Sequence, residues 1–526
     1  MDKLYVNGPI LTMEREKPEQ ALLVCGGRIE AVGSRAQVEE RCRPHTQTVD
    51  LEGRALLPAF IDPHSHLTAV AATLRYVSLE GARSFDDIVA RLTRFRQERN
   101  VSPDQWLIGF GYDHNQLREK RHPDRRVLDR AAEDGPVLIS HASGHMGVVS
   151  TQGLVRLGLA ADTPDPEGGR LGRGEDGSLD GYLEETAFIS ASANMPPPRQ
   201  EESDRLLEEA QRLYLRHGIT TVQDGLTKEE EWTLLSSAAQ RAKLLVDTVC
   251  YPAMKECAHL VTEHPEYQSY SGRLRIGGYK IILDGSPQGR TAWLSQPYEG
   301  EQDGYRGYPA LTDAEAEGYI RRAVEEGAQL LAHCNGDAAA EQLIGLMEKA
   351  VAGGMTPRRP VMIHAQTVRR DQLSRMAALQ MIPSFFIAHI HYWGDIHVKN
   401  LGLERAGRIS PARSAGEAGL RYTFHQDSPV VPPDMPLTLS CAVNRRTASG
   451  RLLGQEEQIT PYEALRAVTI NAAYQYFEEK EKGSLAPGKR ADLVILDRDP
   501  LSVPAEELDR LKILETIKDG ETVYQA

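Results

Sequence analysis

The sequence predicts an α/β protein whose main domain is a (β/α)8 barrel. Apolar, β-like runs alternate with helical patterns such as SDRLLEEAQRLYLRHG and TDAEAEGYIRRAVEEG through the middle of the chain. Such alternation is typical of βα units around a parallel sheet. There are eight such runs, which is the number of strands that closes a barrel. The predicted strands lie at 59–66, 218–225, 243–251, 275–285, 328–337, 360–366, 381–389 and 420–428.

Both ends of the chain have the pattern of short strands separated by turns. Gly26 and Gly27 form a hairpin signal between two apolar stretches, ALLV and RIEAVG. Near the other end, a Pro-Gly turn precedes the strand 491–496, and an Asp-Gly turn interrupts ILETIKDGETVYQA. We therefore predict one small sheet domain assembled from both termini. The predicted boundaries are 1–57 and 478–526 for this domain and 58–477 for the barrel.

One interval is too long for a simple barrel. Residues 67–217 separate the first two barrel strands, which is far more than a βα loop needs. The interval holds helix-like stretches, the apolar run PVLISHASGHMGVVS and a turn-rich piece at 161–181. We interpret it as an insertion whose turn-rich part reaches over the mouth of the barrel.

Composition excludes several classes of protein. In 526 residues, Lys and Arg number 61 and Asp and Glu 75, and the formal charge of −14 argues against a general nucleic-acid binder. No apolar run reaches the roughly 18 residues of a membrane span, and no secretory leader is visible. Six cysteines without a CxxC pair indicate reduced thiols and a cytoplasmic protein. No sequence pattern indicates the oligomeric state, and we expect a homodimer because dimers are the commonest oligomers.

Residues that can bind metal close several of the apolar runs, and barrel active sites lie at the carboxyl ends of the strands. His64 and His66 close the first run and project to the same side of a strand, so both imidazoles can reach one metal. Lys280 lies within an apolar run, where a free ammonium is costly to bury. The fifth, sixth and eighth runs close on His333, His364 and Asp427.

Each of these residues alone has an ordinary structural explanation. An isolated His-x-His is a weak signal, a buried lysine is often paired, and a single histidine at a strand end is often a satisfied core residue. Their combination at the ends of five of eight successive strands is what indicates a metal site.

These motifs occur in the order seen in the amidohydrolase superfamily of metal-dependent hydrolases, which the chain resembles through PAFIDPHSH, the Lys280 strand, LLAHCNGD, MIHAQT and HQDSPV. More narrowly, it resembles the amidohydrolase-3, or YtcJ-like, branch, whose members include N-substituted formamide deformylases. The narrower match rests on segments that span nearly the whole chain: 278–294, 332–339, 383–397, 425–437 and 482–501.

The resemblance implies a barrel fused to a β-sandwich made from both termini, with a metal centre in the barrel. His64, His66 and Asp427 would bind one metal, and His333 and His364 a second. Lys280 matches the carboxylated lysine that bridges the metals of binuclear members, since a carbamate is an anion that two cations can neutralise. We therefore expect two zinc ions, with one metal, or iron, manganese or nickel, as alternatives.

The implied reaction is attack of metal-activated hydroxide on a carbonyl carbon, because a metal lowers the pKa of bound water to near neutrality. Asp427 is expected to accept the water proton and pass it to the leaving amine, acting as base and then as acid. The predicted function is hydrolysis of a non-peptide C–N bond in a small amide, formamide, carbamate or cyclic amide. The alternatives are a mononuclear-metal deaminase of a small heterocycle and an inactive barrel that acts as a binding protein.

Further residues are predicted to contact the substrate. His145, in HASGHMGVV, aligns with a Gly-His element of relatives and is expected at the substrate or its oxyanion, with His141 supporting it. Asp113, in GFGYDHN, matches a Gly-aromatic-Asp element.

A second His-x-His occurs at His389 and His391. We interpret His389, at a strand end, and Tyr392 and Trp393, in an aromatic loop, as the lining of the substrate pocket rather than as a third metal site.

Overall fold

The computed structural model describes residues 2–193, 195 and 197–526, and each of the eight runs predicted as barrel strands contains a strand. All pairings among these strands are parallel, and their side chains are almost entirely buried, as expected for a parallel sheet covered on both faces. The strands are β6 (Phe60–Ile61), β13 (Ile219–Thr227), β14 (Asp247–Pro252), β15 (Leu274–Ile276), β16 (Gly278–Ile282), β17 (Gln329–Cys334), β18 (Val361–His364), β19 (Ile382–Phe385) and β20 (Thr423–Phe424).

Within the described part of the chain, these strands form two sheets rather than one closed ladder. Their orders are β15-β14-β13-β6 and β16-β17-β18-β19-β20, and a parallel bridge between Ala253 and Lys280 joins them. At the other side, the segments that follow β6 and β20 are joined by two backbone hydrogen bonds. His66 N–H donates to the Ser428 carbonyl over 2.9 Å, and Asp427 N–H donates to the His64 carbonyl over 3.2 Å. The mixed α/β architecture agrees with the prediction.

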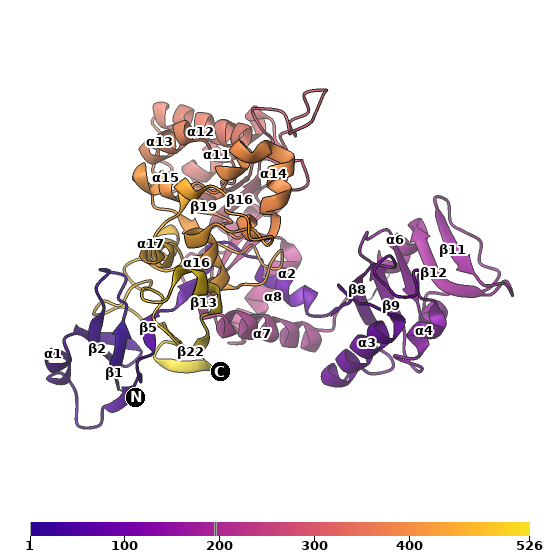
Figure 1. Ribbon diagram of the computed structural model, residues 1–526, viewed down its shortest axis with the longest axis horizontal. Helices are drawn as coiled ribbons and strands as arrows, with labels where there is room; N and C mark the ends of the chain where they lie inside the picture. The colour runs from indigo at the N-terminus through magenta and orange to yellow at the C-terminus, as the bar shows by residue number, and fades with distance from the viewer. Residues whose placement is uncertain (1, 194, 196) are drawn as a thin grey trace. The chain divides into compact units, whose positions relative to one another are not determined.

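Helices follow the strands, and α11, α12, α13 and α15 lie around β16 and β19 (Figure 1). Local sequence explains their starts, for example at α11, where Thr312 and Glu315 form a capping box. The helices of this part of the chain are α2 (Leu67–Thr73), α7 (Gln200–Arg216), α8 (Glu229–Gln240), α9 (Met254–Cys257), α10 (His259–Glu263), α11 (Asp313–Glu325), α12 (Asp337–Ala352), α13 (Arg370–Ala378), α14 (His389–Gly407), α15 (Ala412–Glu417), α16 (Met435–Asn444), α17 (Pro461–Ala467) and α18 (Ile470–Gln475).

Strands from both termini share one eight-stranded sheet, with β1 at a branch point that also pairs β4. The predicted hairpin at Gly26 and Gly27 joins β2 to β3, and the predicted Asp519-Gly520 turn joins β22 to β23. Gly27 has φ +77, and an added Cβ would lie 2.7 Å from the Asp519 carbonyl oxygen, so the two turns pack together only with glycine there. The strands are β1 (Lys3–Ile10), β2 (Glu19–Cys25), β3 (Arg28–Gly33), β4 (Gln47–Asp50), β5 (Ala55–Pro58), β21 (Leu493–Leu496), β22 (Ile513–Lys518) and β23 (Glu521–Gln525). The helix α1 (Arg35–Glu39) follows β3.

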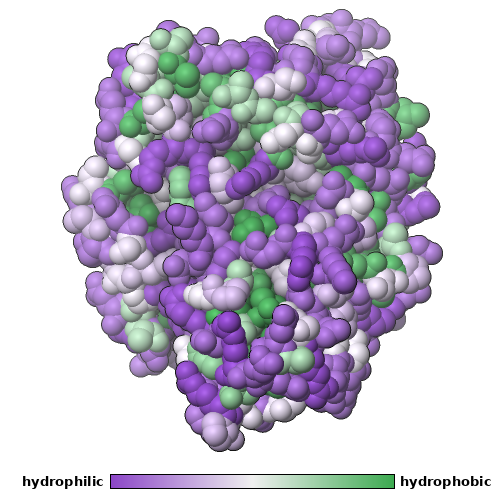
Figure 2. Space-filling model, turned by 90° about the vertical axis from the view of Figure 1, so that its left-hand side faces the viewer, coloured by the Kyte–Doolittle hydropathy of each residue, from purple (hydrophilic) through white to green (hydrophobic). Residues whose placement is uncertain are grey.

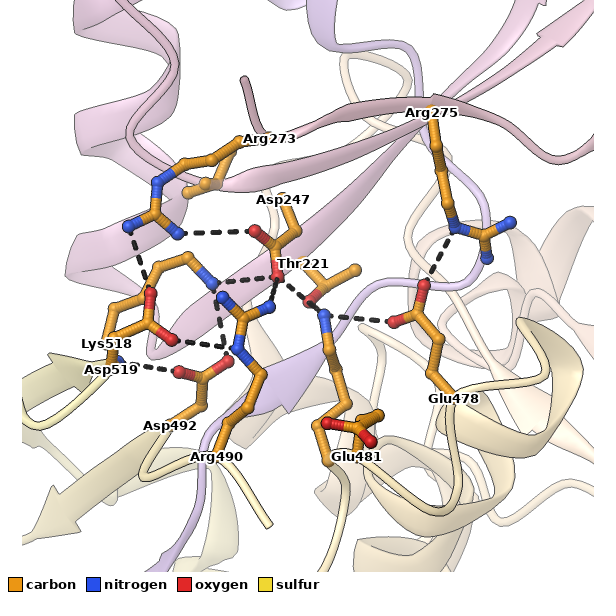
Figure 3. A network of polar contacts seen from close by, with 12 residues as sticks. Thr221, Asp247, Arg273, Arg275, Glu478, Glu481, Arg490, Asp492, Lys518 and Asp519 are labelled. Atoms are coloured by element: carbon orange, nitrogen blue, oxygen red, sulfur yellow. Dashed lines mark hydrogen bonds and ion pairs between the residues drawn. The ribbon is translucent and has the colours of Figure 1, made fainter. Parts of the chain in front are cut away.

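A buried charge network ties this sheet to the first residue of β14 (Figure 3). The Asp247 carboxylate contacts Lys482 Nζ at 2.6 Å, Arg490 at 2.9 Å and Lys518 Nζ at 3.0 Å. Arg273 contacts its other oxygen at 3.3 Å. Burial alone would raise the pKa of this carboxyl, but the surrounding cations hold its pKa well below the usual range.

Residues Ala71–Leu206 form a compact unit of their own, and the remainder of the chain forms the other unit. The sheet of the unit Ala71–Leu206 has the order β11-β12-β10-β9-β8-β7. The pairs among β7, β8 and β9 are parallel, and the remaining pairs are antiparallel. The turn-rich piece at 161–181 contributes to the antiparallel hairpin of β11 and β12 in this sheet. The strands are β7 (Val77–Ser78), β8 (Leu107–Tyr112), β9 (Val137–His141), β10 (Met146–Val149), β11 (Gly169–Arg173) and β12 (Leu179–Glu185). The helices are α3 (Phe85–Arg99), α4 (Arg125–Asp129), α5 (Thr151–Arg156) and α6 (Thr186–Ala193).

The surface is predominantly polar on the face shown in Figure 2, where apolar residues form small, separate patches. Among the helices of the described residues, none combines the length and apolar character needed to cross a bilayer. The six cysteines are unpaired, as predicted.

Candidate functional site

The predicted ligands come together at the carboxyl ends of the parallel strands. His64 and His66 follow β6, Lys280 lies in β16, and His333 lies in β17. His364 is the last residue of β18, and Asp427 follows β20. Because parallel strands end at the same edge, residues separated by hundreds of positions meet there.

One half of the cluster is built around the carboxylate of Asp427. Its Oδ1 lies 3.2 Å from Nε2 of His64 and 3.1 Å from Nε2 of His66. Burial alone would raise the pKa of Asp427, but the neighbouring His64 and His66 hold it well below its usual range, which favours the ionised carboxylate. Tetrahedral zinc with ligands at about 2.0–2.1 Å separates neighbouring donor atoms by about 3.3 Å. The observed separations suit a shared cation.

The other half consists of His333 and His364, whose Nδ1 and Nε2 atoms lie 3.1 Å apart. Nε2 of His333 lies 3.2 Å from the carbonyl oxygen of Gly285 and 3.1 Å from the amide nitrogen of Asn335, so Nδ1 is the ring nitrogen that faces His364. Burial lowers the pKa of His333 to about 4, so its imidazole is neutral. The halves are linked by His364 Nε2, which lies 3.9 Å from Asp427 Oδ2.

Lys280 stands beside His64, with its Nζ 3.4 Å from Nε2 of that histidine. The side chain is 3% exposed, and burial lowers its pKa to about 7. Burial, reinforced by the neighbouring Lys280, lowers the pKa of His64 to about 3. Burial therefore disfavours the charged ammonium form of Lys280.

The backbone is strained at two of the six predicted ligands. His364 has φ +71 and Asp427 has φ +57, a left-handed conformation that non-glycine residues seldom adopt. Such strain persists where the surrounding structure imposes it, and it is concentrated at functional sites.

Residues that the sequence interpretation missed orient these ligands. Gln223, in β13, receives a hydrogen bond from His64 Nδ1 over 2.6 Å, and its amide nitrogen donates to the Pro63 carbonyl and to Tyr476. With its oxygen so directed, Gln223 fixes the proton of His64 on Nδ1 and leaves the Nε2 lone pair facing Asp427. A Cβ on Gly225 would lie 2.6 Å from Cε1 of His64, so only glycine admits that ring.

On the other side of the cluster, His425 orients His364. Nε2 of His425 lies 3.1 Å from Nδ1 of His364, and its Nδ1 lies 2.9 Å from the Ser384 hydroxyl. His425 is two residues before Asp427 on a predicted strand, and Gln223 is a polar residue near the end of another. Polar residues at strand ends were therefore the signal that could have found both.

The region around the second His-x-His differs from the prediction. His389 begins α14, so His391, Tyr392 and Trp393 lie on a helix and not in an aromatic loop. His389 is buried and stacks on His397, with 3.0 Å between Nδ1 and Nε2. Within the residues that the structure describes, His389 and His391 belong to no group able to hold a metal.

The remaining predicted residues belong to the unit Ala71–Leu206. Asp113 follows β8, His141 ends β9, and His145 precedes β10. Oδ1 of Asp113 lies 3.7 Å from Nε2 of His141, while His145 pairs with Glu185 at 3.1 Å. The structure thus brings Asp113 and His141 together and leaves His145 in a different pair.

The fold and the inward-facing histidines and carboxylate define a hydrolase of the metal-dependent class. The chain belongs to the amidohydrolase family, whose model matches residues 47–524. It is a hydrolytic enzyme for C–N bonds other than peptide bonds. The family implies a divalent metal.

Similar proteins match over nearly the full length. The chain is 29% identical to an N-substituted formamide deformylase of Arthrobacter pascens, covering 100% of this chain and 98% of that protein. It is 27% identical to the putative amidohydrolase YtcJ of Bacillus subtilis (strain 168), covering 100% of both. An uncharacterised metal-dependent hydrolase of Pyrococcus furiosus is similar in structure, with a TM-score of 0.76 and 26% identity over 95% of this chain and 100% of that one.

Proposed function

We propose that this protein hydrolyses the C–N bond of a small amide-like molecule at a divalent metal centre: an amide, formamide, carbamate or cyclic amide. The observation that carries the proposal is the lone pair of His64 Nε2, which Gln223 directs toward the ionised Asp427 carboxylate at 3.2 Å. A lone pair and a carboxylate oxygen repel one another at that distance unless a cation lies between or beside them. Lys280 is the nearby basic side chain, with its Nζ 3.4 Å from His64 Nε2, but its burial disfavours the charged ammonium that would offset this repulsion.

The residues fit two ions, with zinc as the default for imidazole and carboxylate ligands. His64, His66 and Asp427 would hold one, and His333 and His364 the other. Lys280 would bridge them as a carboxylated lysine, since its burial disfavours an ammonium ion and a carbamate anion suits a place between cations.

A bound divalent metal supplies two things: it lowers the pKa of a coordinated water, and it polarises the substrate carbonyl. Asp427 supplies the proton transfers. Its carboxylate would take the proton of the attacking water and return it to the leaving nitrogen, so that the C–N bond breaks with a neutral amine leaving. Gln223 and His425 keep the histidines in the tautomers that this arrangement needs.

We further propose that β6, β13–β14 and β16–β20 act as a (β/α)8 barrel, with the terminal sheet as a β-sandwich domain bounded near residues 57 and 478. The two backbone hydrogen bonds between the segments after β6 and β20 support closure. The compact unit Ala71–Leu206 lies within the predicted insertion 67–217.

The test combines metal content with a substrate screen. Purified protein is analysed for metal per chain and assayed on N-substituted formamides first, because of the relative from Arthrobacter pascens, and then on N-acyl amino acids, carbamates and cyclic amides. We expect Lys280→Ala to lose metal and activity together. Metal content that does not change in this variant would favour the mononuclear deaminase instead. Failure of both metal loading and turnover in the unaltered chain would refute the proposal.

A further inference from the structure

A second cluster of ligand-type side chains lies in the unit Ala71–Leu206, at the ends of two parallel strands. β8 and β9 are neighbours, and Tyr112 pairs with His141 in their register. Because β8 continues directly into Asp113 and His114, these two residues meet His141 at one edge of the sheet. Their ligand atoms all lie within 4.8 Å of one another.

The distances within this cluster approach those of a metal site. Nδ1 of His114 lies 3.2 Å from Nε2 of His141. Oδ1 of Asp113 lies 3.7 Å from His141 Nε2 and 4.0 Å from His114 Nδ1. Donor atoms around tetrahedral zinc are separated by about 3.3 Å, so the two histidines already have the spacing and the carboxylate needs to move by less than about 1 Å.

Neighbouring groups hold the three side chains in place. The Asn115 N–H donates to Asp113 Oδ1 over 2.9 Å, which restrains the carboxylate. His122 stacks on His114, with ring centroids 4.1 Å apart, and its Nδ1 is engaged by the Tyr112 hydroxyl at 3.0 Å. His122 therefore packs against the cluster without pointing its Nδ1 into it.

Ser143 contacts His141 Nδ1 through both its backbone N–H and its hydroxyl. Its N–H approaches His141 Nδ1 at 3.0 Å, an arrangement that puts the imidazole proton on Nε2, from where it can be donated to His114. Its hydroxyl also lies 2.9 Å from Nδ1 and can accept a proton placed there, which frees Nε2 to bind a metal. The histidine pair is thus satisfied without a metal, and it becomes a ligand pair when the His141 proton moves to Nδ1, the Ser143 hydroxyl accepts it and the Ser143 N–H turns away.

We propose that Asp113, His114 and His141 of the unit Ala71–Leu206 form a second metal site that takes a single zinc-type cation. Three protein ligands leave a fourth position open, as in sites that hold water or an exogenous ligand. The side chains are 27%, 28% and 11% exposed, so solvent reaches that position. This assignment replaces the substrate contact that the sequence predicts for Asp113 and His141.

The test counts zinc ions in the full-length protein by mass spectrometry after loading with Zn²⁺ and removal of the excess. Asp113→Asn and the double variant His114→Ala/His141→Ala should each bind one ion fewer per chain than the unaltered protein. The matched control is His145→Ala, which removes a histidine paired with a single carboxylate in the same unit, and it should bind the full number.

A barrel-disabled background separates this proposal from the proposed function. The double variant His64→Ala/His66→Ala should retain one ion per chain through gel filtration. When Co²⁺ replaces this ion, it should give a visible absorption band, and the band should be absent from the triple variant that also carries His141→Ala. The second site would be overturned if Asp113→Asn and His114→Ala/His141→Ala bound as many zinc ions as the unaltered protein. It would also be overturned if His64→Ala/His66→Ala retained no metal. If zinc were lost only from Asp113→Asn and His114→Ala/His141→Ala, and not from His64→Ala/His66→Ala, the result would refute the proposed metal centre at His64 and His66. The second site would still be supported. Far-UV circular dichroism verifies that each variant is folded.

Discussion

Replacing Asp247 with Asn should strongly destabilise the unit that contains the terminal sheet and the parallel strands. The substitution keeps the size of the side chain and removes one negative charge from a site that is 1% exposed. Lys482, Arg490 and Lys518 all contact the same oxygen within 3.0 Å, so the change leaves three buried or half-buried cations with less compensation.

The magnitude follows from what remains around those cations. Removing one partner of a buried ion pair costs about 3–5 kcal/mol. After the substitution each cation still has one carboxylate partner. These remaining ion pairs are Lys518–Asp492 at 3.3 Å, Arg490–Asp519 at 2.8 Å and Lys482–Glu478 at 2.9 Å. Because each cation retains a second carboxylate, we expect a loss near the lower limit, about 3 kcal/mol of unfolding free energy.

Native-state hydrogen exchange in increasing urea, read by mass spectrometry, measures this loss on peptides from β14 and β22. The method reports local stability, which is needed because a chain with two compact units does not unfold in one transition. Glu52→Gln is the control, since it removes an exposed ion pair with Arg54 and should leave exchange of the same peptides unchanged.

The difference between Asp247→Asn and the unaltered protein should also depend on pH. The folded-state pKa of Asp247 lies well below its unfolded value of about 3.9. The carboxylate therefore contributes its full stabilisation above about pH 4, and the contribution is lost as the pH falls through the folded-state pKa. A stability difference under about 1 kcal/mol at pH 7, or one that grows on acidification, would refute this reasoning.

Three further predictions concern the cluster of histidines and Asp427 at the ends of the parallel strands. Asp427→Asn should lower kcat by about 10²–10⁴-fold with a much smaller change in KM, and an unaltered kcat would exclude the carboxylate from proton transfer. Gly225→Ala should weaken metal binding by about 10–100-fold, because the added methyl displaces the His64 ring; titration with Zn²⁺ measures the change, and unchanged affinity would show that the ring tolerates it. A chelator should abolish turnover on any accepted substrate and added Zn²⁺ should restore it, whereas full activity after complete metal removal would contradict a metal centre.

Much of the architecture was already predictable from the sequence, because the relevant signals are local. Apolar runs marked each of the eight strand regions, and the Gly26-Gly27 and Asp519-Gly520 turns marked two hairpins. Ligand-type residues at the ends of several buried runs pointed to the candidate site, and the structure brings His64 and His66 together beside Asp427 although both follow β6 rather than lie on it. Residue type and period are enough for such inferences.

Where the sequence interpretation was wrong, a competing local signal had more than one structural solution. The aromatic residues after His389 suggested a loop, yet tertiary packing makes them the first turns of α14. Polar and glycine-rich composition is compatible with loop, helix start and hairpin alike.

Only the tertiary structure decided the roles of residues that act through contacts between distant segments. Gln223 sets the tautomer of His64, although the two residues are 159 positions apart in the sequence. Asp247 forms ion pairs with cationic side chains from the last 50 residues of the chain. His114 gains its significance only beside His141, on the neighbouring strand. A sequence specifies which side chains are available and in which order the strands come. Which lone pair faces which cation depends on strand register and packing, and these exist only once the chain has folded.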